Sequence, residues 1–238
     1  MGREAVVADL TAVFGPALEA GATMTAASVD REIGVAPDGR GAWVAEGLTV
    51  TISGEPATVI PYRVTSVLSE DGGAWTVIAQ AWSVGVTNEE AMAMATAGQL
   101  PPLAAIEPSV GEGAQAMADQ LQAGCADASV WLASWSERPD AFAFGSAPEE
   151  AIEGGTTIRE GMGQMVAAYQ MTIAVNGGMH AKLAPSGTVG FLAANLDMGM
   201  TLEGVGTVSQ PYRALFVYLQ EEGGWRLVQS HFSNGLPQ

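Results

Sequence analysis

The sequence contains one cysteine, one lysine and two histidines among 238 residues, and each scarcity excludes a class of site. Because a disulfide needs two thiols, the single Cys125 excludes an internal disulfide and any cysteine-based metal cluster. Two histidines at unrelated positions do not form the spaced ligand sets of transition-metal sites. The glycine-rich loops that hold phosphate groups are also missing. We therefore expect no metal ion and no cofactor.

Positive charge is scarce as well. Nine lysines and arginines stand against 26 aspartates and glutamates, and the excess is spread evenly along the chain, for a formal net charge of −17. Such a surface repels phosphate backbones and anionic lipids. No apolar run reaches the roughly 18 residues that span a bilayer, and residues 1–5 lack the basic start of a signal peptide. We expect a cytoplasmic protein that binds neither nucleic acid nor membrane.

The strongest pattern that is present is an internal repeat, in which residues 61–86 return as residues 211–236. Eight of the 26 aligned positions are identical, including a Pro-Tyr-Arg triplet at 61–63 and 211–213. A period of about 150 residues is too long for a solenoid unit and suits two copies of one domain. The chain is long enough for two modest domains with separate cores.

Hydrophobic periodicity predicts helices and strands in both copies. An apolar stripe indicates a helix over 3–20, which Pro16 should bend or end early. A long helix is expected from 111 to about 135, and shorter ones over 89–98 and 156–169. Strands are expected at 25–34, 41–53, 57–69, 75–84, 171–176, 179–183, 188–202, 206–219 and 225–233, with a further strand and loop within 140–155. Helices followed by a curled antiparallel sheet predict an α+β fold.

Four segments of the second copy stand out: 131–135 on the long helix, 140–150, the glycine pair at 154–155, and the closing segment 225–233. They resemble the SnoaL-like branch of the nuclear transport factor 2-like superfamily, and the closing segment is also similar to the association domain of calcium/calmodulin-dependent kinase. The resemblance covers about 112–238. It implies a cone-shaped domain, in which a bent sheet wraps a long helix around an apolar pocket and the outer sheet face often dimerises.

The first copy has no counterpart of residues 112–155, which supply the helix and loop that roof the pocket in this family. Either this copy is a degenerate half that packs against the second, or the chain starts downstream of its natural start. We expect two cone-like domains, each a curved antiparallel sheet wrapped on helices, the first copy lacking its leading helices. The predicted boundaries are 1–98, a linker at 99–111, and 112–238. The expected partner surface is the sheet, used in a homodimer or in a pseudo-dimer within one chain.

A ligand pocket can be predicted from strand pairing in the last hairpin. Centring its turn on residues 222–223 places Arg213 and Phe232 on the same face. In the kinase association domain the matching positions look into the pocket. We therefore expect a small apolar ligand with an anionic group that Arg213 binds, or alternatively a structural ion pair of Arg213 with an acid such as Asp197. The predicted pocket residues are Arg213, Phe232, Ser230, Val217, Trp131, Trp135 and Tyr169.

Candidates for catalysis are few. Asp140 and His231 are the candidate bases of a cyclase, isomerase or dehydratase, although the pairing places His231 on the outer face in a packing role. Resemblance to ketosteroid isomerases places their catalytic aspartate at Gly145, and the first helix lacks their tyrosine, which argues against that activity. Glu149 and Glu150 are interpreted as solvated turn carboxylates. A structural association module is the third possible function.

Overall fold

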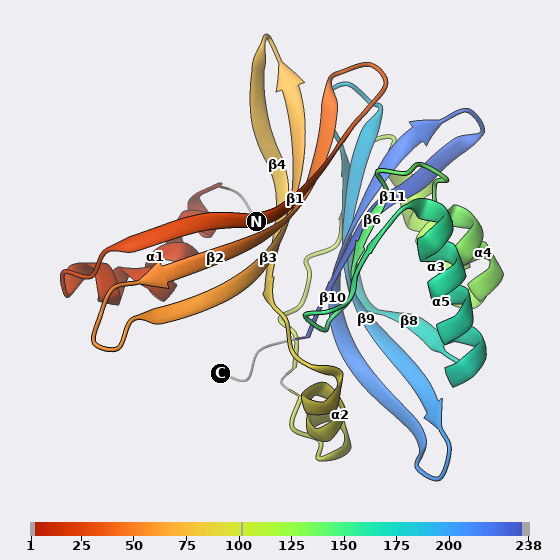
Figure 1. Ribbon diagram of the computed structural model, residues 1–238. Coiled ribbons are helices and arrows are strands. Elements are labelled where there is room, and N and C mark those ends of the chain that lie inside the picture. Colours follow the sequence, from red (N-terminus) through yellow and green to blue (C-terminus); the bar gives the residue numbers. More distant parts are fainter. Residues whose placement is uncertain (1–2, 101, 235–238) are drawn as a thin grey trace.

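The computed structural model describes residues 3–100 and 102–234. Pro101 of the predicted linker and the repeat positions Gly235 and Leu236 lie outside these residues. Two antiparallel-rich sheets lie face to face, and three helices cover the far side of the second sheet (Figure 1). The first four strands form one sheet in the order β1-β2-β3-β4. The other seven strands form the second sheet, in the order β5-β8-β9-β10-β11-β6-β7.

The N-terminal part follows the sequence pattern closely. Its elements are α1 (Arg3–Glu19), β1 (Met24–Val35), β2 (Gly41–Ile52), β3 (Thr58–Asp71), β4 (Ala74–Val84) and α2 (Asn88–Thr96). All four predicted strands are present, because alternating side chains and glycine-rich turns define antiparallel hairpins. The predicted early end of the first helix is wrong, since α1 continues past Pro16.

The C-terminal part has the predicted α+β order. Its elements are β5 (Ser109–Val110), α3 (Gln115–Ala126), α4 (Ala128–Ser134), β6 (Phe142–Phe144), β7 (Ala151–Glu153), α5 (Gly155–Tyr169), β8 (Thr172–Leu183), β9 (Val189–Leu202), β10 (Gly206–Glu221) and β11 (Gly224–Ser233). The predicted long helix is two helices, because Asp127 adopts an extended backbone and its carboxylate caps α4 at the amide of Ser129. The two strands predicted at 171–183 are one strand with a bulge between Val175 and Met179.

The helices α3, α4 and α5 pack on one face of the second sheet and close a cone (Figure 1). The core of the cone combines large side chains from these helices and from the sheet: Met117, Leu121, Trp131, Trp135, Ile158, Leu192, Phe216, Tyr218 and Leu227. The predicted α+β class with a cone-shaped C-terminal domain is therefore confirmed. None of the described helices is long and apolar enough to cross a membrane.

The outer face of the cone sheet packs on the first sheet. Trp43, which is 1% exposed, and Val67 join an apolar layer with Phe191, Leu215 and Val217 of the second sheet. The indole nitrogen of Trp43 donates to the carbonyl oxygen of Asp140 at 3.3 Å. The first copy thus contributes a sheet that is buried against the second copy on one side.

The other side of the first sheet is only partly covered. Ile33, Trp75 and Trp82 remain 54%, 48% and 41% exposed. Together with α1, the ends of β1 and β2 project away from the second sheet (Figure 1). This side corresponds by the repeat to the interior of the cone, so within the described residues the first copy is a sheet without the helices that fill a cone.

Candidate functional site

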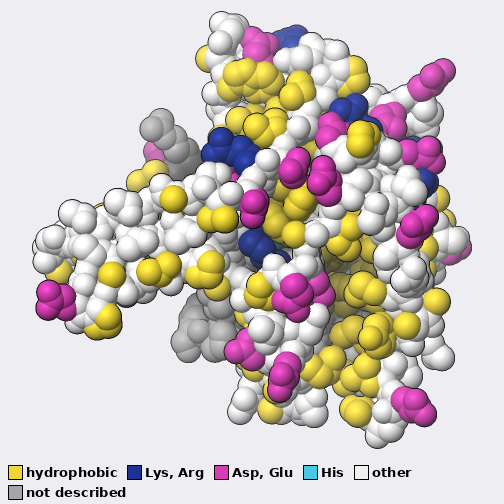
Figure 2. Space-filling model, in the orientation of Figure 1, with side chains coloured by type: hydrophobic (Ala, Val, Ile, Leu, Met, Phe, Trp, Pro, Cys, Tyr) yellow, Lys and Arg dark blue, Asp and Glu magenta, His cyan; other side chains and the backbone are white. Residues whose placement is uncertain are grey.

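The cone contains a cavity of about 260 Å³ between the helices and the inner face of the sheet. Its wall is mostly apolar and includes the aromatic rings of Trp131, Tyr212 and Phe232. Five of the eleven methionines line it as well: Met162, Met165, Met171, Met198 and Met200. Hydrophobic side chains also gather at the surface over this part of the cone, in the lower right of Figure 2. The rings come from α4 and the sheet, and the thioethers come from α5, the residue before β8, and β9. Because thioether side chains are flexible, the wall can adapt to a ligand's shape.

One carboxylate lies at the polar end of the cavity. Glu150 lies at the end of the loop between β6 and β7 and folds back over it, so that one carboxylate oxygen accepts the backbone amides of Ser146 at 2.8 Å and Ala147 at 3.0 Å. The other oxygen accepts the side-chain amide of Asn88 at 3.0 Å. A Cβ on Gly145 would lie 2.1 Å from the Glu150 carboxylate, so this arrangement requires glycine there.

The first copy reaches this end of the cavity at two points. Asn88, which also lines the cavity, is the first residue of α2. From behind the loop, the buried Arg63 donates to the carbonyl oxygens of Ala147 at 2.7 Å and Ser146 at 3.0 Å. The same two residues therefore bind Arg63 through their carbonyls and Glu150 through their amides, which fixes the loop from both sides.

Glu150 carries the only formal charge among the described residues of the wall. Burial raises the pKa of Tyr212, and the charge of Glu150 adds to this shift. Burial also raises the pKa of the Cys125 thiol. Both groups are therefore neutral near pH 7, and the described lining includes no arginine, lysine or histidine.

The prediction that the side chains of Arg213 and Val217 face the cavity is wrong. Strands β10 and β11 pair Arg213 with Ser233 and Ala214 with Phe232, and a bulge follows Val217. The bulge shifts the register by one residue relative to the pairing expected from the turn, and a one-residue shift exchanges the two faces of a strand. Val217 accordingly packs in the layer between the sheets.

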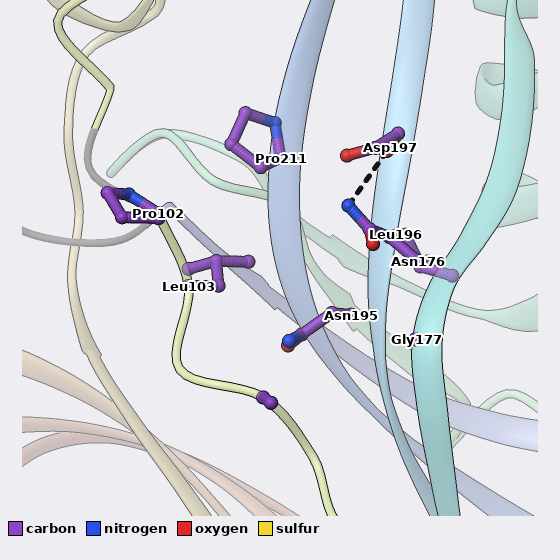
Figure 3. Close-up of a pocket in the computed structure, with 9 residues that line it drawn as sticks. Pro102, Leu103, Asn176, Gly177, Asn195, Leu196, Asp197 and Pro211 are labelled. Atoms are coloured by element: carbon purple, nitrogen blue, oxygen red, sulfur yellow. Dashed lines mark hydrogen bonds between the residues drawn. The ribbon is translucent and has the colours of Figure 1, made fainter.

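Arg213 holds the linker on the outer face of the cone. Its guanidinium donates to the carbonyl oxygen of Ala104 at 2.5 Å and to the side-chain oxygen of Asn195 at 3.3 Å. Among the described residues it forms no salt bridge, so the predicted ion pair with Asp197 is absent. Asp197 instead accepts the amide of Asn176 at 2.9 Å, beside a hollow of about 210 Å³ under the linker (Figure 3).

The other predicted pocket residues divide into two groups. Phe232 and Trp131 line the cavity. Ser230 lies on the cavity side of the sheet, opposite Phe216, but not at the wall, and Trp135 is buried in the core. Tyr169 is 42% exposed and does not line the cavity.

Neither candidate base lies at the cavity. Asp140 forms a two-point ion pair with Arg138, at 2.7 and 2.6 Å, and Arg138 stacks over the ring of Trp43 at 5.5 Å. His231 lies on the outer face of the cone sheet, where its ring nitrogens meet the hydroxyls of Ser83 at 2.7 Å and Thr65 at 3.0 Å. Burial lowers the pKa of His231 to about 3, with a contribution from the charge of Arg63, so the ring is neutral near pH 7.

Sequence reasoning missed Glu150, Asn88 and the methionines. Glu150 follows a segment of small residues and proline, which is also the pattern of a solvated turn. Its signal was Gly145, where a glycine makes room for a returning side chain. The methionines were visible as a high count, 11 in 238 residues, but their gathering in one wall depends on the fold.

In the described residues, no group of three or more His, Cys, Asp or Glu is placed to hold a metal ion.

Comparison with solved structures gives matches of low sequence identity. A nuclear transport factor 2-like superfamily protein from Salmonella enterica serovar Typhimurium is 14% identical, with a TM-score of 0.45, over 51% of this chain and 90% of that one. A protein from Xanthomonas campestris, assigned as a calcium/calmodulin-dependent protein kinase II association domain, is 15% identical, with a TM-score of 0.44, over 56% and 98%. A protein with a cystatin-like fold from Caulobacter vibrioides is 13% identical, with a TM-score of 0.42, over 52% and 87%.

No curated protein matches the sequence. The family model of the SnoaL-like domain matches residues 115–237, which span the cone from α3 to the last strand and make up more than half of the chain. This chain belongs to the SnoaL-like domain family, within the nuclear transport factor 2-like superfamily.

Proposed function

We propose that the C-terminal cone binds a small, largely apolar molecule in its cavity. The observation that carries this proposal is the wall of five thioethers and three aromatic rings around about 260 Å³. An engineered apolar cavity of about 150 Å³ already binds benzene. Thioether side chains fill irregular gaps and contact aromatic rings favourably. The proposed ligand does not carry the anionic group expected from the sequence, because the described wall contains no cationic side chain to bind it.

A binding role is better supported than acid–base catalysis by the predicted residues. Asp140 is paired with Arg138 outside the cavity, and His231 is neutral and enclosed between the sheets. A general base must come within hydrogen-bond reach of the proton it removes. Neither side chain has such access from the cavity.

We further propose that the first copy serves as an intrachain partner of the cone, in place of a second chain. This is supported by the apolar layer around Trp43 and by the polar contacts of Arg63 and His231 across the two sheets. These contacts cover the outer sheet face, through which the family often dimerises. Replacing Trp43 with alanine, which removes the largest ring of this layer, tests this role.

Filling the cavity should prevent binding. Val166 lies on α5 and lines the wall, so a phenylalanine in its place projects into the cavity. We expect V166F to weaken binding of N-phenyl-1-naphthylamine, an uncharged apolar fluorophore, by about tenfold or more, equivalent to roughly 1.4 kcal/mol. Fluorescence titration measures the affinity.

The matched control is A167F, which adds the same ring at the next position of α5, where the side chain is exposed and outside the wall. A167F should bind the fluorophore as the unmodified protein does. Equal affinities for V166F and A167F, or no binding to the unmodified protein, would argue against the cavity as the site.

A further inference from the structure

We propose that the ligand carries a cationic amine, which binds the carboxylate of Glu150. This inference rests on the proposed function and narrows its ligand class to small molecules with an apolar body and an ammonium group. It reverses the charge expected from the sequence, where Arg213 was predicted to meet an anion. The reversal follows from the register of the last hairpin, which directs Arg213 away from the cavity.

The charge of the wall favours a cation. Glu150 is the only formally charged side chain in the described lining, and the remaining wall is apolar or neutral. The faces of aromatic rings attract cations, and three rings line this cavity, those of Trp131, Tyr212 and Phe232. The net charge of −17 also favours the approach of cations over anions.

The geometry of Glu150 leaves a place for an ammonium group. One oxygen is bound by two backbone amides, whereas the other receives a single neutral donor, the amide of Asn88. A carboxylate offers about four acceptor positions, so three donors leave room for another. An ammonium donor forms a charge-assisted bond that is stronger than that of the amide. The ligand can therefore bind beside Asn88 or displace it.

The carboxylate is also held in position before any ligand arrives. The amides of Ser146 and Ala147 hold Glu150, while Arg63 holds the carbonyls of the same two residues from behind. Arg63 is 7% exposed and lies outside the cavity wall. It positions the loop and does not occupy the cavity. A fixed acceptor loses little conformational entropy on binding, which favours affinity.

Three probes with one ring and different end groups test the proposal. Isothermal titration calorimetry at pH 7.5 would compare 2-phenylethylamine, 2-phenylethanol and 3-phenylpropanoate, which are cationic, neutral and anionic. We expect the amine to bind about tenfold more tightly than the alcohol, as a charged hydrogen bond exceeds a neutral one. The carboxylate should bind most weakly. E150Q should bring the affinities for the amine and the alcohol within about twofold.

The control variant is E149Q, which removes the same charge from an exposed neighbour outside the wall. It should keep the preference for the amine, and N88A should keep or increase it because the competing amide is gone. An alcohol that binds as tightly as the amine to the unmodified protein would overturn this inference and leave the proposed function intact. A preference that E150Q and E149Q reduce equally would overturn it too. If none of the probes and no N-phenyl-1-naphthylamine binds, the proposed function itself fails.

Discussion

Replacing Trp43 with alanine is expected to destabilise the chain by about 3–5 kcal/mol, the range for removing a large ring from a packed interior. The ring is 1% exposed and lies between the two sheets. Its removal also deprives Arg138 of the ring over which it stacks and Asp140 of a hydrogen-bond donor. Because both sheets contribute to this layer, the loss should weaken the attachment of the first copy to the cone.

Urea unfolding followed by circular dichroism measures this change without relying on tryptophan fluorescence. The matched control is W75A, on the same sheet, where the tryptophan is 48% exposed. The control should change the free energy of unfolding by less than about 1 kcal/mol. If W43A is tolerated as well as W75A, the layer contributes little, and the first copy does not act as an intrachain partner.

Substituting His231 with glutamine is expected to flatten the dependence of stability on pH. Burial lowers the pKa of His231 to about 3 in the folded chain, against an ordinary value of about 6.5 when unfolded. As pH falls below about 6.5, the unfolded chain takes up a proton that the folded chain excludes. The stability contributed by neutral His231 is therefore complete above about pH 6.5 and is lost as pH falls toward 3.

From these values the unmodified protein should lose roughly 2 kcal/mol between pH 7 and pH 5 through this residue. Urea unfolding at both pH values measures the loss, and the window lies above the range in which most carboxylates titrate. H231Q should lack this loss while keeping hydrogen-bond partners for Ser83 and Thr65. The control variant H180Q, which replaces a half-buried histidine, should still show most of the loss of stability between pH 7 and pH 5. Parallel curves for the unmodified protein and H231Q would contradict the interpretation.

The sequence allowed the strands of both copies to be predicted, because side-chain alternation and glycine turns are local features. The face of each strand in the last hairpin was not predictable in the same way. It depends on a single bulge after Val217, which no composition or period reveals. The repeat correctly indicated that Arg63 and Arg213 occupy equivalent positions. Both bind carbonyl oxygens, and both lie on the sheet face opposite to the one that forms, or corresponds to, the interior of the cone.

The charged end of the cavity could not be predicted, because its parts come from distant segments. Asn88 and Glu150 are 62 positions apart and lie in different copies. A turn with two glutamates usually faces solvent, and only the return of Glu150 over Gly145 brings it to the cavity. Local pattern therefore predicted the helices and strands, and the family resemblance predicted the cone and part of its aromatic wall. Contacts between the copies determined the rest.

The contact of Arg63 with the loop of Glu150 links the evolution of the two halves of the chain. Under the proposed function, a substitution at Arg63 would move the loop and alter which ligands the cone prefers, although Arg63 belongs to the other copy. Duplicated domains can usually diverge independently, but here selection on the ligand would act on both. Among related sequences, positions 63, 88 and 150 should covary, while exposed positions of the first sheet such as Trp75 are free to drift.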